Sequence, residues 1–200
     1  MKKKVIVIHG TPGTGKTTIS RYLCKRIGAI HINISKIVRD ERLYVGVDER
    51  RYCTLIADIE KLTKRLVDLI KSDDDKYFVI EGHFADIVPR EYVKKVIVLR
   101  LDPRELEKRL IKRGWPEKKI AENVLAEILD ECLIEAVNAY GEEVVREIDV
   151  TGKQIDEIVA EIVKAVEDGD EYKPGKVNWL KKLEHEGVMD EYLSWLSSKA

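Results

Sequence analysis

The sequence GTPGTGKT at residues 10–17 matches the phosphate-loop pattern G-x-x-x-x-G-K-[ST], and it follows the apolar run Val5–Ile8. That run is typical of a buried parallel strand. Glycines allow backbone N–H groups of the loop to surround phosphate oxygens, and the positive end of the next helix faces the same anion. We expect Lys16 to reach the β- and γ-phosphates, and to face solvent without nucleotide, while the Thr17 hydroxyl binds Mg²⁺. The segment therefore predicts a site for a nucleoside triphosphate.

The composition excludes several classes of partner. The 200 residues contain 36 Lys and Arg against 37 Asp and Glu, which gives a formal net charge of -1. A chain with this balance has no general attraction to nucleic acid or anionic lipid, so we expect no direct DNA partner and no membrane partner. The cysteines, Cys24, Cys53 and Cys132, lack the sequence spacing of metal ligands and are typical of a reduced compartment. We therefore expect a cytoplasmic protein.

Strand-like runs alternate with helical patterns, which predicts a three-layer α/β/α P-loop NTPase fold with a five-stranded parallel sheet. The predicted strands are Val5–His9, Ala29–Asn33, Tyr77–Glu81, Lys95–Leu101 and Val144–Val150. Helices are expected after the phosphate loop, over Thr54–Lys71, and from Pro116 through Ala136. Another is expected from Pro103, at its first position, to Arg113, with Asp102 as its cap. Residues 168–200 are expected to form a C-terminal helical extension of a domain at 1–167, and its aromatic side chains to pack back on that domain.

The third predicted strand ends in an acid that bears on the class of enzyme. A phosphate loop alone does not separate kinases from other nucleotide-binding proteins. The chain lacks the Asn-Lys-x-Asp guanine reader of GTPases and the paired acids that end a strand in AAA-type ATPases. Instead Glu81 ends a strand beside the phosphate loop, where it can position Mg²⁺ or its water. His83, two residues on, is a candidate to orient a water or contact phosphate.

Two arginines form a candidate lid. Arg109 and Arg113 are spaced i and i+4, so they share one face of the predicted helix. Basic residues that share one side of a helix usually form a solvated face. The alternative is a lid whose arginines close on the transferring phosphoryl group and stabilise its charge.

Several separated motifs resemble one family, the CINAP-type adenylate kinases, over about residues 1–165. They are GTPGTGKTT at 10–18, NISKIVRDERLY at 33–44, GVDE at 46–49, Glu81-x-His83, and KRGWPEKKIAEN at 112–123. The family is a small atypical branch of the nucleoside monophosphate kinases. The resemblance implies an ATP:AMP phosphotransferase with an NMP-binding region at about 33–56 and a short lid at about 112–122. It also implies an ATPase activity that serves maturation of the small ribosomal subunit through a ribosomal protein.

The resemblance also implies roles for individual residues. ATP would be bound by Gly13, Gly15, Lys16, Thr17, Thr18, the lid residue Arg113, and Lys153 near the adenine. Asn33 and Arg39 fall in the region for the acceptor, AMP. The family often has Asp where this chain has Glu81, and the segment after about Glu167 has no counterpart in familiar members.

The sequence therefore predicts a Mg²⁺-dependent kinase that converts ATP and AMP into two ADP. Lys16, Glu81, His83, Arg109 and Arg113 are its candidate catalytic residues, and Thr17 and Glu81 its candidate metal ligands. One alternative is a ribosome-assembly ATPase whose kinase activity is incidental. Another is a kinase for a different small acceptor, such as a nucleoside.

Overall fold

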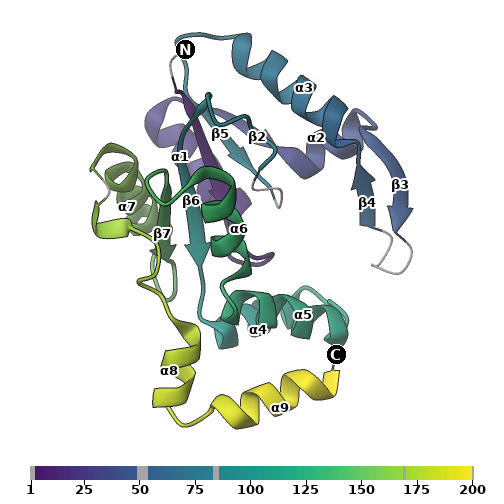
Figure 1. Ribbon diagram of the computed structural model, residues 1–200, viewed down its shortest axis with the longest axis vertical. Helices are drawn as coiled ribbons and strands as arrows, with labels where there is room; N and C mark the ends of the chain where they lie inside the picture. Colours follow the sequence, from purple (N-terminus) through teal and green to yellow (C-terminus); the bar gives the residue numbers. More distant parts are fainter. Residues whose placement is uncertain (1–2, 49–53, 83–85, 169, 200) are drawn as a thin grey trace.

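A parallel five-stranded sheet forms the centre of the structure, a computed structural model that describes residues 3–48, 54–82, 86–168 and 170–199 (Figure 1). The strand order is β2-β5-β1-β6-β7. The strands are β1 (Val5–His9), β2 (Ile30–Asn33), β5 (Phe78–Glu81), β6 (Val93–Arg100) and β7 (Val145–Asp149). All five predicted strands are thus confirmed, and no end differs from its prediction by more than two residues.

Two hydrophobic cores lie on opposite faces of this sheet, because its strands are apolar on both sides. Ile6 and Ile8 of β1 belong to one core, and Val5 and Val7 belong to the other. The first core is covered by α1 (Lys16–Ile27), α4 (Pro103–Lys112), α5 (Glu117–Ile128) and α7 (Ile155–Asp168), and the second by α2 (Ile34–Asp40), α3 (Ile59–Lys71) and α6 (Glu131–Tyr140). The three-layer α/β/α architecture is therefore confirmed.

The order of the strands positions the functional edge of the sheet. β1 is central and pairs with β5 on one side and β6 on the other. In the register, Ile8 lies opposite Glu81, and Asn33 at the end of β2 also lies opposite Glu81. Open α/β sheets bind ligands outside the carboxyl ends of the strands where the direction of winding reverses. Here that point is the phosphate loop after β1.

The helix predicted over Thr54–Lys71 is wrong at its start. Residues Thr54–Ala57 form β4, which pairs with β3 (Tyr44–Asp48) in a separate antiparallel hairpin. The helix begins at Ile59 because the Asp58 carboxylate accepts a hydrogen bond from the Lys61 amide at 3.2 Å, which caps the helix. Its buried stripe is Leu62, Leu66 and Ile70.

The apolar repeat from Ile120 to Ala136 does not form one helix. It is divided between α5 and α6, and Asp130 between them has a left-handed backbone with φ of 58°. A short acidic side chain tolerates that conformation better than most. By contrast, α4 begins as predicted, with Pro103 in its first turn and Asp102 as its cap.

The C-terminal segment packs on the domain, as expected from its aromatic residues. It contains a 3₁₀ turn at Asp170–Tyr172, α8 (Trp179–His185) and α9 (Met189–Lys199). Trp179 and Leu183 are buried, and the rings of Tyr192 and Trp195 stack with centroids 5.7 Å apart. α9 lies alongside α5, so the end of the chain returns to the α4–α5 region (Figure 1). Among the described residues, no helix has the length and apolar character needed to cross a membrane.

A buried charge network joins this segment to the sheet. Arg100, at the end of β6 and 1% exposed, donates from Nε to Glu127 Oε1 at 2.9 Å and from Nη1 to Glu147 Oε1 at 2.5 Å, and it also pairs with Asp130. The Trp179 indole donates to Glu127 Oε1 at 3.0 Å. Although burial opposes it, the pKa of Arg100 is raised, because Glu127 and Asp130 stabilise the guanidinium.

Arg100→Met is expected to lower the free energy of unfolding by about 3–5 kcal/mol, because it leaves two buried carboxylates without their cation. Urea denaturation followed by circular dichroism measures this loss. The matched control is Arg65→Met, since the ion pair of Arg65 with Glu41 is exposed and should be worth less than about 1 kcal/mol. Equal losses in the two variants would contradict the role of the network.

Candidate active site

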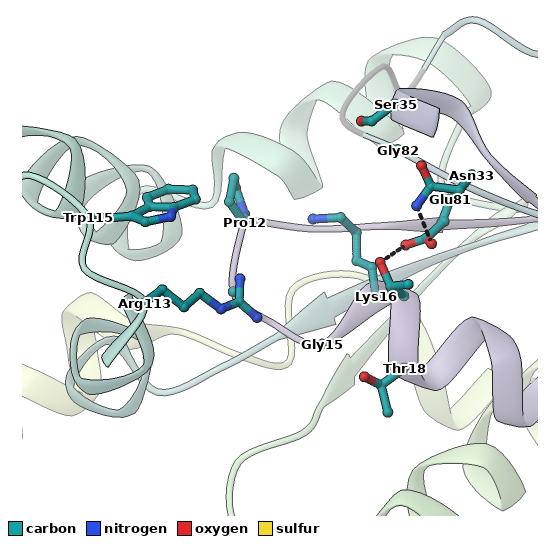
Figure 2. A pocket seen from close by; sticks show the side chains of 12 residues that line it. Pro12, Gly15, Lys16, Thr18, Asn33, Ser35, Glu81, Gly82, Arg113 and Trp115 are labelled. Carbon is teal, nitrogen blue, oxygen red and sulfur yellow. Dashed lines mark hydrogen bonds between the residues drawn. The ribbon is translucent and has the colours of Figure 1, made fainter. Parts of the chain in front are cut away.

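A cavity of about 210 Å³ opens where the carboxyl ends of β1, β2 and β5 meet the phosphate loop (Figure 2). Its walls come from the loop and α1, from the β2–α2 junction, from the end of β5 and from the α4–α5 junction. The lining residues are Pro12, Gly13, Gly15, Lys16, Thr17, Thr18, Asn33, Ser35, Glu81, Gly82, Arg113 and Trp115. The structure therefore brings together most of the residues that the sequence identified separately.

The phosphate loop requires glycine at two positions for reasons of space as well as of backbone angle. Gly10 has φ of 135°, and a Cβ added there would lie 2.6 Å from the Leu99 carbonyl oxygen. Gly13 has φ of 107°, and its added Cβ would lie 2.6 Å from Leu106 Cδ1. Both angles disfavour residues with a side chain. The loop consequently packs its backbone closely against β6 and α4.

Lys16 does not face solvent, and that expectation is wrong. Its side chain turns back into the loop, where Nζ donates to the Gly10 carbonyl at 2.5 Å and to the Thr11 carbonyl at 3.1 Å. Burial lowers the pKa of Lys16 from its ordinary 10.5 to about 8. An ammonium removed from water in this way is poorly hydrated, so phosphate oxygens can replace the carbonyls as its partners.

Glu81 is held by donors from two other elements. Its Oε2 accepts from the Thr17 hydroxyl at 2.8 Å, and its Oε1 accepts from Asn33 Nδ2 at 2.7 Å (Figure 2). The same Oε1 lies 3.1 Å from His31 Nε2. Burial alone would raise the pKa of Glu81, but the hydrogen bonds from His31, Thr17 and Asn33 outweigh it and hold this pKa below its ordinary value. The carboxylate is therefore ionised at neutral pH.

Glu81 and Thr17 fit the magnesium ion that a phosphate loop implies. Mg²⁺ prefers hard oxygen ligands and is usually held by one or two carboxylates together with substrate phosphates. The carboxylate and hydroxyl oxygens are adjacent beside the loop that would hold those phosphates.

His31 is a site residue that the sequence analysis missed. It lies two residues before Asn33 on β2, so both side chains point to the same face of the strand and can reach Glu81. Alternation along the strand was the signal that could have identified it. Asn33 has a second role, since its Oδ1 accepts from the Lys36 amide at 2.8 Å and caps α2.

A second cavity, of about 520 Å³, lies on the other side of the loop. Lys153 and Thr18 line it, together with both candidate lid arginines, Arg109 and Arg113. Its other walls are Gly13, Thr14, Gly15, Ile19, Lys112, Val150, Ile155 and Ile158. Lys153 also pairs with Glu161 at 2.7 Å.

Arg113 lines both cavities and ends α4 as its C-terminal cap. Its guanidinium points toward the phosphate loop (Figure 2). Arg109 instead pairs with Glu105 on its own helix, and its Nη1 donates to the Gly13 carbonyl at 3.4 Å. The two arginines thus face the same loop, but Arg113 is the one positioned between the cavities.

Two predicted site residues are not placed at the site. Arg39 is exposed on α2 and is not among the described residues that line either cavity. His83 lies outside the described part of the chain. Trp115, which the sequence analysis did not assign to the site, lines the first cavity, and Lys119 Nζ lies 4.3 Å from the centre of its ring.

The phosphate loop is also connected to the C-terminal segment. Thr11 Oγ1 donates to Glu127 Oε2 at 2.5 Å, while the other oxygen of Glu127 accepts from Arg100 and Trp179. One buried carboxylate therefore links the loop, β6 and α8.

Comparison with known proteins gives both sequence relatives and structural neighbours. A family model described as an AAA domain matches residues 6–130. Glu81 is followed by Gly82, so the chain lacks the paired acids that end a strand in AAA-type ATPases.

The curated relatives include archaeal proteins named "Putative adenylate kinase". The relative from Methanocaldococcus jannaschii is 41% identical over 177 residues, which covers 88% of this chain and 93% of the relative. The relative from Methanosarcina barkeri is 38% identical over 184 residues, with coverage of 88% and 97%.

Solved structures with a similar fold include two small-molecule kinases. A gluconokinase from Sinorhizobium meliloti has a TM-score of 0.52 at 16% identity, covering 82% of this chain and 91% of that one. A shikimate kinase from Bacteroides thetaiotaomicron has a TM-score of 0.50 at 14% identity, covering 82% and 98%. At such identities these two structures show a shared fold alone.

The lowered pKa of Lys16 predicts a pH dependence of stability. Between about pH 8 and 10 the unfolded chain keeps the Lys16 proton and the folded chain does not, so the cost of burying the ammonium is relieved as the pH rises. Without nucleotide, the unfolding free energy of the wild type should therefore rise relative to that of Lys16→Met, by about 1.4 kcal/mol per pH unit in this window. Urea unfolding at several pH values measures the difference.

Lys36→Met, at an exposed lysine on α2, is the control for general effects of pH. Its difference from the wild type should stay constant over the same range. A constant difference for Lys16→Met as well would refute the lowered pKa.

Proposed function

The chain belongs to the family of these archaeal adenylate kinase relatives, and on this premise we propose that it transfers the γ-phosphoryl group of ATP to AMP, which yields two ADP. The family membership and the kinase-type fold support a phosphotransferase of the nucleoside monophosphate kinase class. The observation that carries the proposal is the convergence of Lys16, Glu81 and Arg113 on one phosphate loop with a cavity on each side.

The two cavities suit the two nucleotides. The larger one, with Thr18, Lys153 and Arg113, would take the base and ribose of ATP, while its phosphates follow the loop. The smaller one, with Asn33, Ser35 and Gly82, would take the phosphate of AMP. Arg113, which lines both, would lie near the phosphoryl group as it passes between them.

Positioning and charge account for catalysis in this proposal, and no covalent intermediate is needed. Lys16 and the loop amides would hold the β- and γ-phosphates. Thr17 and Glu81 would hold Mg²⁺, which supplies positive charge to the phosphate oxygens. Glu81 is ionised and oriented by Asn33 and His31, so its geometry is fixed before substrate binds.

Closure of the α4–α5 junction would complete the site. Gly114 follows Arg113 with φ of 70°, and nothing lies within 4 Å of where its Cβ would be. Pro116 then caps α5 with a fixed φ. The junction can therefore turn at Gly114 and carry Arg113 toward bound phosphate.

We also propose, from the motif resemblance, that the chain is of the CINAP type, hydrolyses ATP, and binds a small-subunit ribosomal protein. One observation favours a protein partner. The hairpin β3–β4 exposes several apolar side chains, among them Val45 at 70%, Val47 at 48% and Ile56 at 47%. Exposed apolar side chains gathered on one two-stranded hairpin favour an interaction site.

A panel of acceptors with ATP and Mg²⁺ tests the function, with ADP and free phosphate measured separately. We expect AMP to stimulate ATP turnover most, with ADP as the product. Release of free phosphate at a rate that AMP does not change would instead support the assembly ATPase. A faster reaction with a nucleoside or another acceptor would overturn the assignment to AMP.

Arg113→Ala is expected to lower kcat by about 10²-fold or more and to change the Kd of ATP little, because the contact forms fully only on closure. Arg113→Lys should recover part of the loss, since an ammonium cannot make the forked contact of a guanidinium. Steady-state kinetics and ATP titration measure these effects. Lys108→Ala, at an exposed position on the same helix, is the control and should be neutral. A raised KM with unchanged kcat in Arg113→Ala would refute the lid role.

A further inference from the structure

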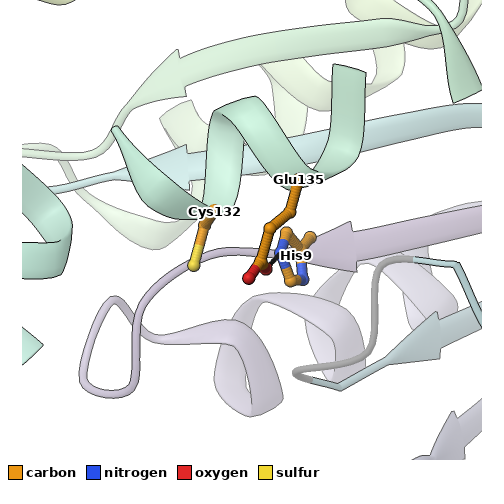
Figure 3. Close-up of side chains that lie close together, drawn as sticks. All are labelled: His9, Cys132 and Glu135. Carbon is orange, nitrogen blue, oxygen red and sulfur yellow. Dashed lines mark ion pairs between the residues drawn. The ribbon is translucent and has the colours of Figure 1, made fainter. Parts of the chain in front are cut away.

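Three potential metal ligands that are far apart in the sequence lie together at the base of the phosphate loop. They are His9 at the end of β1 and Cys132 and Glu135 in the first two turns of α6. Figure 3 shows both side chains extending from α6 on the side of the helix that faces the end of β1, with the Glu135 carboxylate next to the imidazole. One donor atom from each residue lies within 4.8 Å of the other two. Such a group of nitrogen, sulfur and oxygen donors differs in kind from the oxygen pair of Thr17 and Glu81.

The imidazole of His9 has one nitrogen that no described group satisfies. His9 is 1% exposed, and its Nδ1 lies 3.3 Å from the Gly82 carbonyl oxygen, to which it can donate only if Nδ1 carries the proton. Nε2 is then a bare acceptor, it is fully buried, and it has no hydrogen-bond partner. A metal-binding histidine has the same arrangement, with its other ring nitrogen donating to a backbone carbonyl.

The carboxylate that lies beside Nε2 is itself a hydrogen-bond acceptor. Glu135 Oε2 lies 3.5 Å away, so a lone pair faces a carboxylate oxygen. A cation between the two atoms would satisfy both.

The distances and donor types select the ion. Tetrahedral zinc with bonds of about 2.0–2.3 Å places its ligand atoms about 3.3–3.8 Å apart, which matches the separation of His9 and Glu135. Cys132 Sγ needs to approach by about 1 Å at most, which rotation of its side chain can supply. A thiolate ligand favours zinc over magnesium or calcium. In the occupied site the thiolate and the carboxylate balance the two charges of the ion, and the proton of the Cys132 thiol is released to solvent.

We propose that His9, Cys132 and Glu135 bind a zinc ion, with water as the fourth ligand. The half-exposed side chain of Glu135 gives the ion and the water a route from solvent. The ion would tie β1 to α6 at the point where the phosphate loop begins. This site is independent of the nucleotide chemistry, and its test needs neither substrate.

Calorimetric titration of the full chain with zinc chloride tests the proposal, after treatment with a chelator and in buffer free of nucleotide and magnesium. We expect a single zinc ion per chain. Cys132→Ser and Glu135→Gln should each weaken binding by roughly tenfold or more. Cys24→Ser and Glu131→Gln are matched controls, since Cys24 lies in the other core and Glu131 lies one turn before Glu135, and both should bind as the wild type does.

Cobalt titration gives a readout that identifies the sulfur ligand. Co²⁺ in the site should produce a thiolate charge-transfer absorption and the visible bands of a tetrahedral ion. Both should be present in Cys24→Ser, and the charge-transfer band should be lost in Cys132→Ser. Glu135→Gln keeps the proposal falsifiable if changes at Cys132 disturb folding, because Glu135 is at the surface. Absence of binding, or binding that neither variant weakens, would overturn the proposal and leave a buried polar cluster only.

Discussion

The buried guanidinium of Arg100 is the interaction on which the arrangement of the C-terminal half depends. Removing an arginine from water is costly unless its donors are paired, so its partners must be brought to it from other elements. Those partners are Glu127 on α5, Asp130 before α6, and Glu147 on β7. The break between α5 and α6 follows from the same requirement, because the left-handed Asp130 is the residue whose carboxylate meets Arg100.

The carboxylates in this network extend its effect to the C-terminal segment and to the phosphate loop. Glu147 Oε2 accepts from the successive backbone amides of Gly175, Lys176 and Val177, and Glu127 accepts from the Trp179 indole. The second oxygen of Glu127 accepts from Thr11. Without residues 175–179, both acids would lose donors in a place where water cannot fully replace them. The segment that follows the αβ domain is thus part of its polar core.

Glu81 has the corresponding role on the other side of β1. Three donors, from β2 and α1, converge on it, and the register of the sheet explains two of them, since Asn33 lies directly opposite Glu81 and His31 is on the same face of the strand. The glutamate side chain reaches both Thr17 and β2 at once. A shorter aspartate, the residue often found here in the resembling family, reaches less far from the same strand position.

The sequence by itself determined what depends on neighbours along the chain. The phosphate loop, the five strands and the Asp102 cap with Pro103 were predictable, because apolar runs, loop glycines and capping groups act within a few residues. Lys16, Glu81 and Arg113 were predicted as site residues from their places relative to that loop and from the family resemblance, and the structure places all three at one cavity.

The tertiary structure alone decided what depends on residues that are distant in the sequence. Four features belong here: the burial of Lys16, the β3–β4 hairpin, the bond from Trp179 to Glu127, and the meeting of His9 with Cys132. The apolar repeat continues through Asp130, so periodicity could not reveal the break between α5 and α6. That break depends on the ion pair of Asp130 with the distant Arg100. Cysteine spacing gave no sign of a metal site, since ligands brought together by a sheet and a helix need no regular spacing. The burial of a side chain and the pairing of its charge depend on the whole fold, so these features can be seen only in the tertiary structure.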